Sequence, residues 1–141
     1  MATAFKISDA AALALHAVTM MVQHPDAPLP THTIASALKC SEAHLSKVMQ
    51  RLVRAGLAIS SRGPKGGFML SKPEDELNIL DVLEAIEGPL STGGCLLNPP
   101  QCDGKECLFG ALSTHVNAIV RKELLRITAS DLRRRKHIAL P

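Results

Sequence analysis

The chain has 141 residues, enough for one domain with its own core and too few for two ordinary ones. It lacks Trp and Tyr and has only three Phe, so its core must consist of Leu, Ile, Val, Ala and Met, most of which favour helices. The net charge is only +3, no apolar run reaches the roughly 18 residues that would span a membrane, and the N-terminus lacks a secretory signal, so we expect a cytoplasmic protein with reduced thiols and no membrane contact.

The first third of the sequence predicts three helices separated by short breaks. Ser8 is placed to cap the first helix and Thr31 to cap a short second one. Ser41 is placed to cap a third helix over residues 42–55, and Gly56 stands at its stop. Two short helices joined by a turn of three or four residues form a helix-turn-helix.

The next segment predicts a small hairpin and a fourth helix. LAISSR, GPKGG and FMLSK read as two short strands around a glycine-rich turn, which is the wing of a winged helix. NILDVLEAIEG predicts a short helix that ends at Gly88. The expected fold class is therefore mainly α with a small β-hairpin.

A longer helical pattern follows, from about residue 108 to residue 128. It carries an apolar stripe formed by Leu112, Val116, Ile119, Val120, Leu124 and Ile127. A small domain cannot easily cover this stripe, so we expect a homodimer in which the same helix of a second chain covers it. The alternative is that the helix folds back on its own domain. Beyond it, Thr128 and Asp131 form a capping pair that opens a last short helix or tail.

Charge is segregated along the chain. Residues 39–72 hold seven basic side chains and one acid, residues 73–88 hold six acids and no base, and residues 121–136 hold seven bases and two acids. A basic segment is often only a solvated surface, and winged helices also bind proteins. Here the first basic segment coincides with the helix-turn-helix and the wing, which together predict binding to double-stranded DNA.

The second helix of the pair supplies most of the candidate DNA contacts. Its N-terminal side chains His44, Ser46 and Lys47 are placed to read bases in a major groove, whereas Arg51 and Arg54 are placed to bind phosphate. Two further cations flank the wing turn and could enter a minor groove. The complete predicted DNA-binding set is Ser41, His44, Ser46, Lys47, Gln50, Arg51, Arg54, Arg62 and Lys65.

Nothing in the sequence predicts an enzyme. There is no nucleophile and base arrangement, no phosphate-binding loop of the P-loop type and no GxGxxG motif. The remaining chemistry lies in the cysteines.

Three cysteines stand in a loop rich in Gly and Pro. Cys95, Cys102 and Cys107 are spaced C-x6-C-x4-C, a density at which reduced cysteines are usually ligands. Zinc prefers closer C-x2-C pairs, whereas an iron-sulfur cluster accepts wider spacings and needs four ligands. Cys40 falls in the helix-turn-helix turn, where a structural role is expected. Zinc ligation and metal-free thiol chemistry, aided by Lys105 beside Cys107, remain alternatives.

Together these segments resemble the winged-helix, iron-sulfur transcription regulators typified by IscR and the nitric-oxide sensor NsrR. The resemblance covers about residues 5 to 132, and its most specific part is RGPKGG followed by DVLEAIEG. The segments that carry it, besides the cysteine loop, are SDAAALAL, SEAHLSKVMQRLVRAGL, RGPKGGF and NILDVLEAIEGPL.

The resemblance implies a dimeric transcription regulator that binds palindromic promoter DNA and senses nitric oxide, oxygen or redox state, or iron-sulfur status. It implies that Cys95, Cys102 and Cys107 hold a 4Fe-4S or 2Fe-2S cluster. In NsrR-type members an aspartate from the other subunit completes a 4Fe-4S site, and Asp9 matches its position. The alternative is that Asp9 is an ordinary acidic residue in the first turn of a helix, where the helix dipole favours a negative charge. His115 is out of register with the histidine of IscR-type members, which favours 4Fe-4S over 2Fe-2S.

The expected domain organisation has three parts. Residues 1–90 form the winged helix-turn-helix DNA-binding domain, residues 91–107 the cluster-binding cysteine loop, and residues 108–141 the dimerisation helix and a basic tail.

Overall fold

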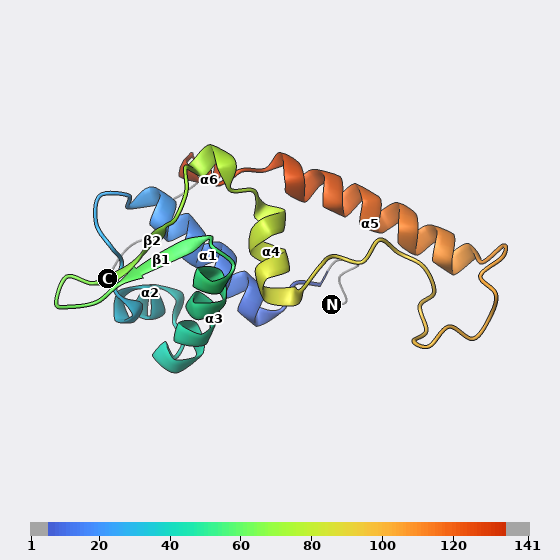
Figure 1. Ribbon diagram of the computed structural model, residues 1–141, viewed down its shortest axis with the longest axis horizontal. Helices are drawn as coiled ribbons and strands as arrows, with labels where there is room; N and C mark the ends of the chain where they lie inside the picture. The colour runs from blue at the N-terminus through green and yellow to red at the C-terminus, as the bar shows by residue number, and fades with distance from the viewer. Residues whose placement is uncertain (1–5, 135–141) are drawn as a thin grey trace.

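The computed structural model of the chain describes residues 6–134. It shows a mostly helical body with a two-stranded hairpin, from which one long helix projects (Figure 1). The fold class predicted from the sequence is thus confirmed. In chain order the elements are α1 (Asp9–Gln23), α2 (Thr31–Leu38), α3 (Glu42–Arg54), β1 (Ala58–Ser61), β2 (Gly67–Leu70), the short 3-10 helix η1 (Glu74–Glu76), α4 (Ile79–Glu87), α5 (Leu108–Arg126) and α6 (Ala129–Arg133).

Serine side chains cap α1 and α3 at their predicted starts. The Ser8 hydroxyl oxygen accepts a hydrogen bond of 3.2 Å from the Ala11 N–H, which confirms the predicted start of α1. Ser41 caps α3 in the same way. The predicted cap at Thr31 is wrong: Thr31 is the first residue inside α2, and Pro30 occupies the cap position without a side-chain bond.

The hairpin is held against the body by a third extended segment. Strands β1 and β2 pair antiparallel, with Ala58 opposite Leu70. Leu29 and Phe68 exchange two backbone hydrogen bonds of 2.9 Å each, so the segment before α2 lies along β2. These bonds position the wing beside the helix-turn-helix, as a winged helix requires.

The core is centred on α1, which packs against α3, α4 and α6. Ala11, Ala14 and Ala17 are fully buried, and their small side chains let neighbouring helices approach closely. The largest fully buried side chains around them are Met20, Ile34, Leu45, Met49, Leu52, Leu77, Leu80, Val18, Val22 and Val82. The aliphatic core predicted from the composition is therefore present, and it is built almost entirely within the body.

Helix α6 returns the chain to this body after α5. The Ala129 N–H donates a 2.7 Å hydrogen bond to the Leu77 carbonyl, and Ala129 is fully buried in the core. The predicted capping box of Thr128 and Asp131 is present. The following basic residues Arg135 and Lys136 lie outside the described residues.

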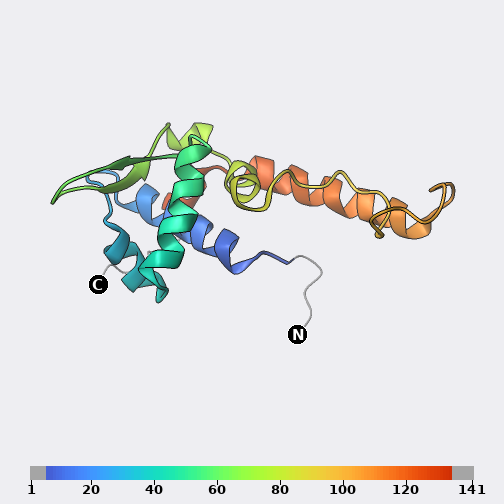
Figure 2. The same ribbon diagram turned by 60° about the horizontal axis from the view of Figure 1, so that its bottom comes forward.

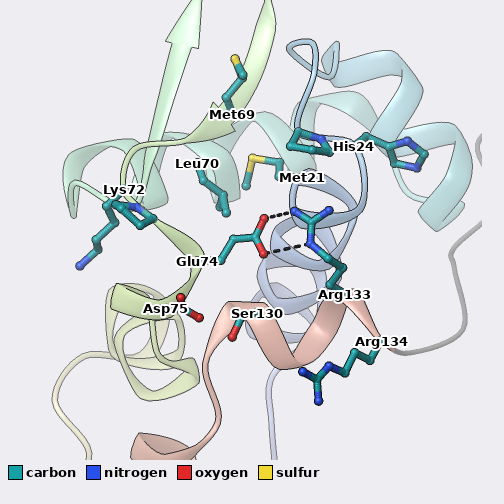
Figure 3. A pocket seen from close by; sticks show the side chains of 12 residues that line it. Met21, His24, Met69, Leu70, Lys72, Glu74, Asp75, Ser130, Arg133 and Arg134 are labelled. Carbon is teal, nitrogen blue, oxygen red and sulfur yellow. Dashed lines mark hydrogen bonds and ion pairs between the residues drawn. The ribbon is translucent and has the colours of Figure 1, made fainter.

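An ion pair between Arg133 and Glu74 fastens α6 to η1, and Figure 3 shows it beside a hollow of about 500 Å³. The hydrogen bond and the charge of Glu74 raise the pKa of the Arg133 guanidinium above its ordinary value. None of the predicted site residues lines this hollow. The pair of Arg133 with Glu74 in this hollow links α6 to the body.

Helix α5 leaves the body and carries no buried residue. Both views show the chain after α4 running beside α5 to its far end, where it turns back to begin the helix (Figures 1 and 2). Leu112 is 57% exposed, Val116 41% and Ile119 51%, whereas Leu124 near the body is partly buried against the core. Half of the predicted stripe, the part farther from the body, is therefore exposed in one chain, and Val120, Leu124 and Ile127 are half-buried.

Of the helices in residues 6–134, none is both long enough and apolar enough to cross a membrane.

Candidate DNA-binding surface and cysteine loop

The exposed face of α3 gathers most of the predicted DNA contacts. His44, Lys47, Gln50 and Arg54 are all exposed, while the opposite face of the helix is buried against α1 and α4. They line one hollow of about 400 Å³ together with Ala10, Val48 and Arg51. The amphipathic pattern of α3 produces this surface, because its apolar stripe fixes which side faces outward.

The other side of α3 faces the hairpin. Ser46, Gln50 and Arg54 line a second hollow together with Val53, Ser60 and Phe68. Arg62 and Lys65 are exposed at the hairpin tip, where the Gly66 N–H donates a 2.9 Å bond to the Gly63 carbonyl and closes the turn. Cations from α3 and from the wing thus stand on two neighbouring elements.

The cations of α3 and the hairpin tip differ in their ion pairing from the other basic side chains. The acidic segment pairs with bases from outside the helix-turn-helix: Lys72 with Asp81, Arg121 with Glu84, and Arg133 with Glu74. Within residues 6–134 no ion pair involves α3 or the hairpin tip. Apart from Lys72 at its end, the first basic segment therefore makes no ion pair in the described part of the chain, whereas acids of the body partly neutralise the third.

Two residues of the predicted set have structural partners. The Ser41 oxygen caps α3 through the His44 N–H at 3.2 Å. The Arg51 guanidinium donates a 2.9 Å hydrogen bond from Nη1 to the backbone carbonyl of Ile86 in α4. A role for either residue at DNA stays a prediction, and Arg51 has a second role inside the protein.

The three loop cysteines share one hollow at the far end of α5. Cys95, Cys102 and Cys107 line a space of about 580 Å³ with glycines and the first turn of the helix. Cys95 and Cys102 are exposed, Cys107 is half-buried, and all four cysteines of the chain are free thiols. The loop thus places three sulfur donors around one space.

Backbone N–H groups point at two of these sulfurs. The Gly110 N–H donates to Cys107 Sγ at 3.3 Å, and the Leu97 N–H donates to Cys95 Sγ at 3.4 Å. In iron-sulfur proteins, hydrogen bonds to the sulfurs are among the factors that set the reduction potential of the cluster. The loop also begins close to the helix, because a Cβ at Gly93 would stand 2.3 Å from Thr114 Cα.

The donor types at the hollow are compatible with a metal group. In the part of the chain that the structure describes, no three His, Cys, Asp or Glu side chains could hold one metal ion. The three thiols that line the hollow are the ligand type that an iron-sulfur cluster takes from a protein. Their role as ligands stays a prediction.

Asp9 and Cys40 lie elsewhere in the protomer. Asp9 is exposed at the start of α1, and it lines a separate hollow with His16, Cys40 and His44. Cys40 packs partly against the core, as expected of a structural residue. Within one chain the structure does not bring Asp9 to the loop cysteines, and its predicted role requires the second subunit.

Known proteins place this architecture in a family. A family model described as an iron-dependent transcriptional regulator, Rrf2, matches residues 7–135. The chain belongs to the Rrf2 family. A predicted HTH-type transcriptional regulator of Aquifex aeolicus (strain VF5) is 34% identical over 95 residues, which cover 67% of this chain and 66% of that protein. As a member of this family of transcriptional regulators, the chain is not an enzyme.

Solved structures share the fold along nearly the whole chain. CymR of B. subtilis, titled the global cysteine regulator, aligns with a TM-score of 0.75 at 26% identity and covers 92% of this chain and 96% of its own. IscR of T. potens aligns with a TM-score of 0.75 at 23% identity and covers 92% of this chain and 86% of its own. The family model confirms, at the level of the family, the resemblance found from the sequence.

Sequence reasoning missed two features of these sites. The bond from Arg51 to the Ile86 carbonyl joins residues 35 positions apart, and no local sequence pattern predicts it. The close approach of Gly93 to Thr114 had a partial signal in the Gly93 and Gly94 pair, since adjacent glycines mark places where backbone can approach closely.

Proposed function

We propose that the protein is a dimeric transcription regulator whose binding to promoter DNA is controlled by an iron-sulfur cluster. The observation that carries this proposal is the hollow at the start of α5, where three free thiols from one loop meet the first turn of the long helix. Membership of the Rrf2 family supports the regulator, and the donor set supports the cluster.

Helix α3 is the proposed recognition helix. His44, Ser46 and Lys47 lie in its N-terminal half, the part of such a helix that reaches base edges in the major groove. Arg54 in the last turn is placed for phosphate, and Arg62 and Lys65 on the wing for an adjacent groove. The uncompensated charge of these side chains supports the assignment.

Dimerisation is proposed through the outer face of α5. Leu108, Leu112, Val116 and Ile119 recur at helical spacing along one face and are 41% to 76% exposed. An apolar strip that follows a projecting helix matches an identical strip on a second copy, because a two-fold axis places the same patch on both sides. Two recognition helices related in this way would bind a palindromic site.

Cys95, Cys102 and Cys107 are the proposed cluster ligands, and Asp9 of the second subunit is the proposed fourth. A 4Fe-4S cluster is favoured over 2Fe-2S. When bound, it would supply an iron site that reacts with nitric oxide or oxygen, most readily at a corner held by oxygen instead of sulfur. Two contacts of the chain hold the ends of the cysteine loop in place. Gly93 packs on Thr114 near its start, and Cys107 caps α5 at its end, so both ends of the loop contact the same helix.

A cluster-free regulator is the second candidate function. In this alternative the same cysteines act as redox thiols or zinc ligands. The exposure of Cys95 and Cys102 favours thiol chemistry, and the similarity to CymR, a cysteine regulator, points the same way.

The visible spectrum, with iron and sulfide analysis, of protein purified without oxygen separates the two. A cluster regulator gives brown protein that loses its colour in Cys95→Ala and keeps it in Cys40→Ala, the matched cysteine control outside the loop. Asp9→Ala is expected to retain colour with an altered spectrum or lability. Colourless wild-type protein that cannot be reconstituted would overturn the cluster, and stoichiometric zinc or reversible thiol oxidation would then identify the alternative.

A further inference from the structure

The last turn of α4 makes polar contacts with three other helices. Its residues run from Glu84 to Glu87, and Gly88 closes the helix by donating a 3.0 Å bond to the Glu84 carbonyl. Each of the contacts described below leaves this turn for a different part of the chain. The turn therefore has more long-range polar partners than a helix end needs for its own capping.

The first contact goes to the recognition helix. Arg51 Nη1 donates 2.9 Å to the Ile86 carbonyl, which is one of the carbonyls that the helix itself leaves unsatisfied. An arginine at this place also faces the negative end of the α4 dipole. Because Arg51 stands one turn before the end of α3, the bond sets the position of the half of α3 nearest to Arg54.

The second contact goes to the long helix and to the cysteine loop. Glu84 Oε1 accepts 2.9 Å from Arg121 Nη1 in α5 and 3.0 Å from the Leu90 N–H, where the chain sets out towards the cysteines. The Glu84 side chain is 26% exposed and that of Arg121 is 45% exposed, so the pair is partly shielded from solvent. One carboxylate thus holds both segments that lead to the thiols.

The third contact goes to the start of α1. Glu87 Oε1 accepts 3.3 Å from the Ser8 N–H, next to Asp9. Asp9, the ligand proposed for the cluster of the second subunit, therefore begins a helix that is bonded to the same turn of α4. The recognition helix, the long helix, the loop and the Asp9 end of α1 all converge on four consecutive residues.

We propose that this turn, residues 84–87, is the junction that transmits the position of α5 to the recognition helix, with Glu84 and Arg51 as its positioning residues. The inference rests on the proposed function for its biological use, since that function makes α5 the element that responds. Glu84 and Ile86 belong to one turn of one helix, and a helix in a packed core moves as a unit. A displacement that pulls on Glu84 therefore carries the Ile86 carbonyl, and Arg51 with it.

Hydrogen exchange of the cluster-free, DNA-free full chain tests the transmission directly. Arg121→Gln cuts the link at α5, and it should speed amide exchange in the last turns of α3 by about two- to fivefold, the range that one weakly shielded ion pair can shift a local opening equilibrium. The matched control is Glu123→Gln, which breaks a 2.7 Å ion pair to Arg126 that stays within α5. Unchanged exchange in α3 of Arg121→Gln, with altered exchange confined to α4 and α5, would overturn the junction.

DNA binding tests the coupling in the complete regulator. The readout is the ratio of operator Kd values without and with the cluster, expected in wild type at about 5- to 150-fold for an allosteric coupling. Glu84→Gln, with dimerisation and iron content unchanged, should bring this ratio to within about twofold of one, whereas Glu123→Gln should keep it. A wild-type ratio of one would refute the proposed function. The junction would then be tested by the hydrogen-exchange measurement alone. A normal ratio in Glu84→Gln would refute the junction alone.

Discussion

Cys107 Sγ accepts a 3.3 Å hydrogen bond from the Gly110 N–H, so one side chain both caps α5 and lines the hollow of the cysteine loop. Cysteine is an unusual cap, and serine or threonine would satisfy the same N–H. The long helix therefore begins at a candidate ligand. Whatever binds at this sulfur acts on the first turn of the helix proposed to form the dimer.

Substitutions at position 107 separate the cap from the ligand. Cys107→Ser keeps an oxygen that can accept from the Gly110 N–H, whereas Cys107→Ala removes cap and ligand together. Both variants should lose iron and visible colour, and only the alanine variant should lose about 0.5–2 kcal/mol of helix stability. Circular dichroism during thermal unfolding, with iron analysis, checks both parts. Full iron content in the serine variant would show that Cys107 is not a ligand.

The DNA contacts of α3 should differ in role according to their position along the helix. Lys47→Ala is expected to relax sequence selectivity, at a cost of about 1–3 kcal/mol against the cognate site, because Lys47 lies where the helix reaches base edges. Arg54→Ala should weaken all DNA about equally and lower the slope of log K against log salt by about one unit. Titrations of operator and random DNA at several salt concentrations measure both effects. Equal losses on the two DNAs in both variants would reject this division of roles.

Local patterns predicted the helices and the wing because each is determined over a short stretch. Ser41, the stripe of α3 and Gly56 lie within sixteen residues, and together they specify a capped helix with one buried face. The cap at Thr31 failed because Pro30 suits the position before the first helical residue, and a short helix can begin there without a side-chain bond.

The sequence predicted which residues belong to the candidate sites, but it did not predict how those residues are arranged in space. The stripe of α3 implied its outward face, so the side chains of the DNA surface followed from the period of the helix. The bond from Arg51 to Ile86 and the pair of Glu84 with Arg121 depend on how α4 packs between α3 and α5, which no local pattern encodes. Arg51 accordingly looked like a phosphate contact alone. The fourth ligand stays a prediction for the same reason, since it depends on the packing of two chains.

The wing should depend on the absence of a side chain at position 67. A Cβ on Gly67 would lie 2.4 Å from the carbonyl carbon of Leu29, so Gly67→Ala must push the hairpin away from the segment before α2. Amide exchange at Leu29 and Phe68, whose N–H groups make the 2.9 Å bridge, should accelerate, with a loss of about 1–3 kcal/mol of stability.

Gly63→Ala provides the control, because a Cβ there meets nothing within 4 Å and its strain stays in the turn. It should leave the exchange of the Leu29 and Phe68 amides unchanged. Equal acceleration in both variants would mean that the close contact at Gly67 does not hold the wing in place.

Dimerisation should fail when charge enters the outer face of α5. Leu112 is 57% exposed in the single chain, and Leu112→Glu would place a carboxylate in the proposed interface, where burial without a partner costs several kcal/mol. The expected result is a monomer in sedimentation equilibrium, with binding to a palindromic site reduced to that of a half-site. Ala118→Glu adds the same charge at an exposed position that 100° per residue places on another side of the helix, and it should remain a dimer. A dimeric Leu112→Glu protein would place the interface elsewhere and leave the apolar face of α5 for a different partner.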